Sequence, residues 1–106
     1  MLNKFDDAVK VYLKALDLNE QSPECHFNLA SAFNDLAQYQ KSAQHYQRAI
    51  ELDEKNIDAY VCLGQVYEQL KQWDKAERSY NLALQREPEN ARAKENLHKL
   101  KGAKAK

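Results

Sequence analysis

Residues 57–90 read IDAYVCLGQVYEQLKQWDKAERSYNLALQREPEN, and this one stretch decides the fold. Its first half places large and small apolar residues at helical spacing, namely Tyr60, Leu63, Gly64 and Tyr67. Its second half repeats that arrangement and ends in a helix breaker, with Ala76, Tyr80, Ala83 and Pro88. Side chains three or four residues apart share one face of a helix, and small residues let a neighbouring helix approach closely. The stretch therefore predicts two packed helices joined by a short turn.

The same unit occurs again when the sequence is shifted by 34 residues. Positions that keep their chemistry in three copies are Leu2, Leu36 and Leu70; Phe5, Tyr39 and Trp73; Ala8, Ser42 and Ala76; Tyr12, Tyr46 and Tyr80; Ala15, Ala49 and Ala83; and Leu16, Ile50 and Leu84. The first helix of the unit matches in two copies, through Leu29 and Leu63, Ala30 and Gly64, and Phe33 and Tyr67. A fixed period of this length indicates stacked repeats, in which each unit buries its apolar face against its neighbours.

The pattern resembles that of the tetratricopeptide repeat (TPR) family, whose unit is a helix-turn-helix of 34 residues. The resemblance implies an all-α fold, a TPR α-solenoid of antiparallel helix pairs wound into a right-handed superhelix, with about six helices. We expect these helices at residues 4–18, 23–36, 39–52, 57–70, 73–86 and 91–101. The chain then forms a single TPR domain over residues 1–106. It divides into a half repeat at 1–22 that supplies only a second helix, TPR units at 23–56 and 57–90, a cap helix at 91–101 and a basic, frayed tail at 102–106.

Residues at the helix ends and turns refine this prediction. Good N-cap residues stand just before predicted helices at intervals of one repeat: Ser22, Asn56 and Asn90. The turn within a unit usually carries glycine in the family, whereas here it is Ala37-Gln38 and Lys71-Gln72. We therefore expect either that a residue other than glycine adopts a strained backbone in each of these turns, or that the turn has a different shape.

The first repeat begins halfway through, so the helix predicted at 4–18 has no partner within its own unit. Such a helix leaves an apolar face uncovered, because each repeat relies on its neighbours for a continuous core. Two alternatives follow. The chain is a segment of a longer array, or the open face is covered by another protein or by a second copy, in a homodimer through residues 4–18.

Composition supports a helical protein and excludes several classes. Only two glycines and two prolines occur among 106 residues, of which 43% are hydrophobic. The longest apolar run, at residues 59–63, is too short to cross a bilayer, and no signal-peptide pattern opens the chain, so we expect no membrane partner. Cys25 and Cys62 lie within predicted helices, which favours reduced thiols in an intracellular, cytoplasmic protein.

In TPR proteins the first helices of successive units line a concave groove, and the resemblance implies that this groove binds an extended peptide or a partner's helix. The positions that carry over as the peptide-binding groove are Glu24, Phe27, Asn28, Ser31, Asp35, Asp58, Val61, Cys62, Gln65, Glu68, Gln69 and Asn96, with Asn34, Arg92, Glu95 and Lys99 beside them. Asn28 is the best single candidate, since an amide can donate to and accept from a peptide backbone at once. A merely exposed polar residue is the alternative for Asn28, and partial core packing is the alternative for Phe27 and Val61.

The chaperone-binding subgroup of the family makes a sharper test of the ligand. Those domains clamp a C-terminal carboxylate with lysine, arginine and asparagine side chains. Asn28 matches the middle asparagine of that clamp, but Asp58 and Cys62 stand where its third-unit cations belong. Because carboxylates are recognised by cations, we expect no carboxylate clamp. The groove is acidic through Glu24, Asp35, Asp58 and Glu68. A neutral or basic protein or peptide is therefore the expected partner.

Catalysis, metal binding and cofactor binding find little support. His26 takes the place of the aromatic Tyr60, so it is most simply a packing residue. Cys25 and His26 are adjacent and point to different faces of a helix, and no second cysteine or histidine stands three or four residues away. We predict no enzyme activity, no catalytic residues, no metal and no cofactor.

A basic tail raises the question of nucleic acid. Residues 1–90 carry 10 basic and 15 acidic side chains and residues 91–106 carry 6 and 1, which together give the 16 of each in the chain. The tail cations are Arg92, Lys94, Lys99, Lys101, Lys104 and Lys106. They lack interleaved aromatic residues and the body of the chain is acidic, so we expect a solvated face and no nucleic-acid partner.

We therefore predict a protein-protein interaction module, or scaffold, that binds a peptide segment or partner helix in the TPR groove and is part of a longer TPR protein. Two alternatives stay open. One is a partner- or substrate-recruiting segment of a larger enzyme similar to the O-linked N-acetylglucosamine transferases, and the other is self-assembly through the incomplete N-terminal repeat.

Overall fold

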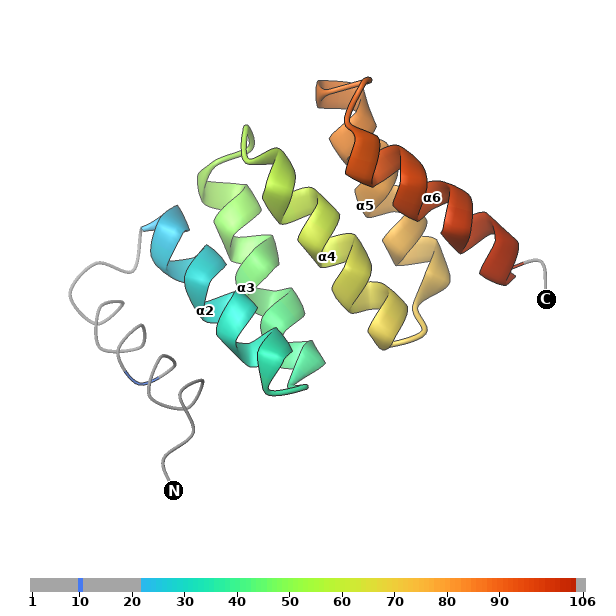
Figure 1. Ribbon diagram of the computed structural model, residues 1–106. Coiled ribbons are helices and arrows are strands. Elements are labelled where there is room, and N and C mark those ends of the chain that lie inside the picture. Colours follow the sequence, from blue (N-terminus) through green and yellow to red (C-terminus); the bar gives the residue numbers. More distant parts are fainter. Residues whose placement is uncertain (1–9, 11–21, 105–106) are drawn as a thin grey trace.

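The computed structural model describes Lys10 and residues 22–104, and this part of the chain is built of five α-helices without strands (Figure 1). They are α2 (Pro23–Asp35), α3 (Tyr39–Leu52), α4 (Ile57–Gln69), α5 (Trp73–Arg86) and α6 (Ala91–Lys104). The all-α class is confirmed. The half repeat at 1–22 and its helix at 4–18, which complete the expected six helices, fall outside the described residues apart from Lys10 and Ser22.

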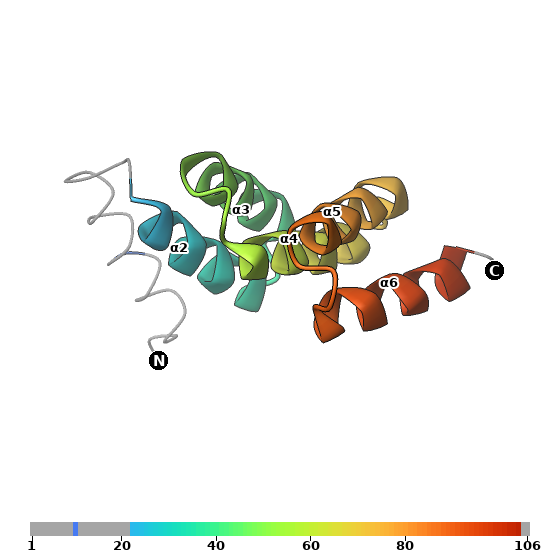
Figure 2. The same ribbon diagram turned by 90° about the horizontal axis from the view of Figure 1, so that it is seen from above.

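The helices form two layers. Seen from above, α3 and α5 lie on one side, and α2, α4 and α6 follow one another along the other (Figure 2). Within each unit the two helices pack against each other, α2 on α3 and α4 on α5. Between units α3 packs on α4 and α5 packs on α6, while α4 also contacts α6. Each helix thus touches only its near neighbours, as stacked repeats require.

The predicted caps begin the helices. Ser22 Oγ accepts a hydrogen bond from the Cys25 N–H at 3.1 Å, and Asn56 Oδ1 accepts one from the Ala59 N–H at 3.2 Å. Asn90 Oδ1 accepts from the Ala93 N–H at 2.8 Å. Each bond satisfies a donor that has no partner within the helix, so these three residues fix where the inner helices start.

Of the two alternatives expected for the turns within the units, the structure shows the strained backbone. Ala37 has φ of 60° and Lys71 has φ of 59°, in the left-handed region. In the first turn the Gln38 N–H donates to the Phe33 carbonyl at 2.9 Å and the Ala37 N–H donates to the Asn34 carbonyl at 3.0 Å. The second turn repeats both bonds, one unit later. This is the Schellman arrangement, which ends a helix and satisfies its last carbonyls.

The core lies between the layers and uses the repeating aromatic and small positions. Tyr80 and Ala83 of α5 are fully buried, as are Ala30 of α2 and Ala49 of α3. Ser42, which replaces alanine in one copy, is also buried, and its Oγ donates to the Ala30 carbonyl oxygen at 2.7 Å. A hydroxyl is therefore tolerated at a spacer position, because it reaches a backbone acceptor of the neighbouring helix.

The last helix departs from the prediction at its end. The sequence predicts that α6 stops at residue 101 and leaves a frayed tail, whereas the helix continues to Lys104. Gly102 is exposed, and no heavy atom lies within 4 Å of the point where a Cβ on this residue would stand, so nothing crowds the helix there. Lys99 and Lys101 lie near the negative end of the helix dipole, where cations are favourable. None of the helices in the described region is long and apolar enough to cross a membrane.

Candidate functional site

The inner face, formed by α2, α4 and α6, carries the predicted groove residues, and these differ in how accessible they are. Glu24, Asp35, Asp58, Gln65 and Gln69 are exposed, whereas Phe27, Asn28, Ser31, Cys62, Glu68 and Asn96 are partly buried. Val61 is 0% exposed. The prediction that Val61 contacts a ligand is therefore wrong, because its side chain belongs to the core between the layers. Phe27 packs edge-on against Tyr46 with ring centroids 5.5 Å apart, so part of its surface is used in packing.

Several predicted residues come together in one polar hollow. It encloses about 290 Å³ and is lined by Asn34 of α2, by Gln65, Glu68 and Gln69 of α4, and by Asn96 of α6. The three inner helices therefore all contribute to it. Four of the five lining side chains are neutral amides, which can both donate and accept hydrogen bonds. Asn28, Glu24 and Asp58 do not line this hollow.

Glu68 is the one carboxylate among the side chains that line the hollow. It is held by Tyr80 of the outer layer, which is the layer formed by α3 and α5 (Figure 2). The Tyr80 hydroxyl, from α5, donates a hydrogen bond to Glu68 Oε2. The ring reaches this point because it passes close to Gly64, where an added Cβ would stand 2.5 Å from Tyr80 Cε1. Burial, and then the hydrogen bond and charge of Glu68, raise the pKa of Tyr80 well above its ordinary value. Tyr80 thus stays a protonated donor, and glycine at position 64 opens its path to the inner face.

A second tyrosine makes the equivalent link one unit earlier. Tyr46 of α3 is buried, and its hydroxyl interacts with Cys62 and Ser31 on the inner face. Burial and then the neighbouring Cys62 raise the pKa of Tyr46. Burial also raises the pKa of Cys62, against the opposing effects of its Tyr46 hydrogen bond and of Arg92. The Cys62 thiol is therefore protonated at neutral pH, which makes it a poor nucleophile and metal ligand.

Asn96, which lines the hollow, carries an unsatisfied donor. Its Nδ2 is buried and has no hydrogen-bond partner among the described residues. Buried polar atoms without partners are uncommon, because leaving one unpaired costs about 1 to 3 kcal/mol. An oxygen supplied from outside the described residues would satisfy this donor.

The charged side chains of α4 and α6 beside the predicted groove positions are exposed and paired with each other. Asp58 Oδ1 lies 3.9 Å from Arg92 Nη1, and both side chains are more than half exposed, so this pair is weak. Glu95 and Lys99 of α6 pair at 3.0 Å. Position 58 therefore carries a carboxylate with a loosely held arginine beside it, and not the lysine that a carboxylate clamp would place there.

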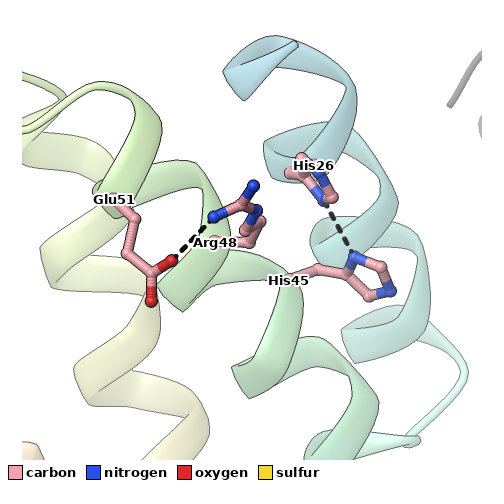
Figure 3. A network of polar contacts seen from close by, with 4 residues as sticks. All are labelled: His26, His45, Arg48 and Glu51. Carbon is pink, nitrogen blue, oxygen red and sulfur yellow. Dashed lines mark hydrogen bonds and ion pairs between the residues drawn. The ribbon is translucent and has the colours of Figure 1, made fainter. Parts of the chain in front are cut away.

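The histidines lie away from the hollow. His26 of α2 is buried, and its Nδ1 lies 3.1 Å from Nδ1 of His45 on α3 (Figure 3). The two rings stack with centroids 5.3 Å apart, and His45 also stacks on Phe33. His26 thus packs between helices, as its replacement of an aromatic residue predicts. In the part of the chain that the structure describes, no three histidine, cysteine or acidic residues gather as a metal site would require.

Sequence reasoning missed the parts of Tyr46 and Tyr80 that reach the inner face. The repeat pattern predicts both only as core fillers, because their rings occupy the aromatic position of the second helix. The available signal was the hydroxyl itself: a buried tyrosine needs a partner for its O–H, and the inner face of the preceding helix is the nearest polar surface.

Comparison with known proteins agrees with this architecture. A family model described as TPR repeat matches residues 2–37 and 30–71, and one described as tetratricopeptide repeat matches residues 57–90. Among curated proteins, none matches the chain significantly.

Solved structures, two of them described as TPR domains, superpose closely on the chain. The Arabidopsis OM64 TPR domain is 31% identical, with 94% of this chain and 83% of that chain covered and a TM-score of 0.88. The first TPR of Spaghetti (RPAP3), bound to the HSP90 peptide SRMEEVD, is 28% identical over 97% of this chain and 82% of that chain, with a TM-score of 0.92. MamA is 30% identical over 95% of this chain and 59% of that chain, with a TM-score of 0.92. The chain therefore belongs to the tetratricopeptide repeat family.

Proposed function

We propose that the chain is a protein-protein interaction module whose inner face binds an extended peptide or a partner's helix. The observation that carries this proposal is the polar hollow to which α2, α4 and α6 all contribute, with Asn96, whose buried Nδ2 is unpaired, among its lining residues. A peptide backbone supplies a regular series of carbonyl and N–H groups, which suit a surface of neutral amides. The peptide bound to the related TPR of Spaghetti (RPAP3) supports a peptide as ligand.

The charge of the inner face leads to a second part of the proposal, that the ligand is neutral or basic. The related domain binds SRMEEVD, an acidic peptide. This chain places Asp58 and Cys62 where a carboxylate clamp has cations, and Glu24, Asp35 and Glu68 add negative charge. Like charges facing each other across an interface oppose binding. The acidic residues of this chain's groove therefore favour a ligand of a different charge from the peptide bound to that domain.

Within this function Asn28 is proposed to hold the peptide backbone beside the hollow. It is partly buried and stands one repeat before Cys62 and two repeats before Asn96 on the same face. The division into a half repeat, units at 23–56 and 57–90 and a final cap helix is proposed with it, as is membership of a longer TPR protein. Recruitment of substrates by a larger enzyme and self-assembly through residues 4–18 remain the alternative functions.

Titration of the isotopically labelled chain with two peptides, followed by NMR, tests the proposal. One peptide is SRMEEVD, and the other carries lysine in place of its three acidic residues and an amidated C-terminus. We expect the basic peptide to shift the amide signals of α2, α4 and α6 at lower concentration than the acidic one. Shifts confined to α3 and α5, or none from either peptide, would exclude the inner face as a peptide site. Tighter binding of SRMEEVD would exclude the charge preference alone.

A further inference from the structure

We propose that the hollow lined by Asn34, Gln65, Glu68, Gln69 and Asn96 is a subsite for a lysine or arginine side chain of the bound peptide, anchored by Glu68. This inference rests on the proposed function, because it names the side chain that one part of the peptide-binding face selects. A subsite for a basic side chain requires a fixed negative charge, neutral surroundings and a group that distinguishes a peptide from a free cation. The hollow provides all three.

Glu68 is the negative charge. It is the sole charged residue among the five that line the hollow. The ion pairs between described residues join other side chains, and none includes Glu68. One repeat earlier the same position is Asn34, so the carboxylate is a feature of this unit and not of the repeat pattern. A partly buried carboxylate that has no cation within the described chain attracts a cation from the ligand.

Tyr80 holds that carboxylate in place before the ligand arrives. Its hydroxyl donates to Glu68 Oε2, and its ring is fully buried between α4 and α5. One carboxylate oxygen is therefore fixed by the protein, and the other is left for the ligand. Ordering the side chain in the free protein lowers the entropy lost on binding, because less freedom remains to be frozen.

Asn96 distinguishes a peptide from a bare cation. Its buried Nδ2 needs an oxygen acceptor, which an ammonium or guanidinium group cannot provide. A basic residue within a peptide brings both groups: its side chain for Glu68 and a backbone carbonyl for Asn96. A polyamine or a metal ion would meet the carboxylate and leave the amide unpaired. An acidic side chain in the hollow would be repelled by the carboxylate of Glu68.

Three pools of acetylated and amidated octapeptides test the subsite. Each pool has random neutral residues around one fixed position, which is lysine, norleucine or glutamate. We expect the lysine pool to bind about five- to tenfold more tightly than the norleucine pool, between the strengths of an exposed ion pair and a buried charged hydrogen bond. The glutamate pool should bind most weakly. Spermine, a cation without a carbonyl, should leave the Asn96 side-chain signal unchanged in the NMR spectrum.

Variants locate the preference at Glu68. Glu68→Gln keeps the shape and an acceptor for Tyr80, and should bring the ratio between the lysine and norleucine pools close to one. Glu51→Gln removes an exposed carboxylate of α3, outside the predicted groove, and should keep the ratio. Asn96→Ala should weaken all three pools alike. Circular dichroism establishes that each variant folds.

The outcomes separate the subsite from the wider function. Equal binding of the lysine and norleucine pools, or a ratio that survives Glu68→Gln, overturns the basic-residue subsite while peptide binding stands. A spermine-induced shift of the Asn96 side chain also overturns it, because a bare cation would then suffice. If no pool shifts any signal of α2, α4 or α6, the proposed function itself fails.

Discussion

Gly64 separates α4 from the Tyr80 ring, and its replacement measures how tightly this crossing is packed. A Cβ on Gly64 would lie 2.5 Å from Tyr80 Cε1, and the fully buried ring has no room to withdraw. Overpacking of this kind costs about 1 to 3 kcal/mol, against about 1 kcal/mol gained in helix propensity. We expect Gly64→Ala to lower the free energy of unfolding by about 1 kcal/mol, measured by urea denaturation.

Gly102 is the matched control for that substitution. It lies in α6 with nothing within 4 Å of its Cβ position, so Gly102→Ala adds helix propensity without a clash. It should leave stability unchanged or raise it by up to about 1 kcal/mol. If Gly64→Ala were as stable as Gly102→Ala, the close approach of Tyr80 to α4 would be wrong.

His45 gives the chain a pH dependence whose direction follows from its surroundings. Burial, and then the nearby His26, lower the pKa of His45 from its ordinary value of 6.5. The folded state therefore disfavours the charged imidazole more than the unfolded state does. Stability from this group is fully present above pH 6.5 and is lost as the pH falls below that value through the folded pKa.

Thermal unfolding between about pH 5 and pH 7.5, the range in which histidine titrates, tests this effect. The wild-type chain should lose stability on acidification, and His45→Gln should lose less of it. His98→Gln, at an exposed position of α6, should follow the wild type. An identical pH profile for His45→Gln and the wild type would contradict the assignment.

At the scale of single elements, the turns between paired helices are strained. Ala37 and Lys71 adopt positive φ, a region that costs a residue with a Cβ about 1 to 2 kcal/mol. Glycine relieves that strain but is more flexible when unfolded. We expect Ala37→Gly and Lys71→Gly each to raise the free energy of unfolding by up to about 1 kcal/mol, measured by urea denaturation.

The neighbouring residue provides the control for the turn. Gln38 has φ of −94°, which a side chain adopts without strain. Gln38→Gly should therefore destabilise the chain. Stabilisation by glycine at 38 but not at 37 would show that the left-handed position is wrongly placed.

For the whole molecule, the stacking order predicts where the fold opens first. α4 packs against α3, α5 and α6, whereas α2 packs mainly against α3 among the described helices. Local opening requires the loss of fewer contacts at the ends of a stack than in its middle. Native-state hydrogen exchange should therefore be slowest in α4 and α5 and faster in α6. Uniform protection from α2 to α6 would indicate one cooperative unit instead.

Much of this architecture is predictable from the sequence, because the repeat period and the caps are local signals. Ser22, Asn56 and Asn90 place three helix starts. The absence of glycine from the turns at 37–38 and 71–72 predicts an unusual turn, but not which residue adopts the positive φ. Helix periodicity predicts which residues lie on the inner side of each helix. It does not predict how deeply each side chain is buried. It assigns Val61 to the groove, whereas close packing against the outer helices buries that side chain.

The contact between Tyr80 and Glu68 could not be predicted from the sequence, for a related reason. The two residues lie on different helices, and whether the hydroxyl emerges on the inner face depends on how closely α5 approaches α4 at Gly64. The distance between α4 and α5 is set by how the two helices pack together, and the sequence of either helix alone does not determine it. The gathering of Asn34, Glu68 and Asn96 likewise depends on the offset between three successive helices.

The crossing of Tyr80 beneath α4 also constrains how such a chain can diverge. An outer-layer residue holds an inner-layer carboxylate. Under the proposed subsite, a change in α5 therefore alters ligand choice without touching the ligand. Phenylalanine at position 80 would keep the core filled and release Glu68. A larger residue at position 64 would also release Glu68, because its side chain would push the Tyr80 ring away from α4. Under this proposal, the specificity of the chain depends partly on residues of the layer that faces away from the ligand.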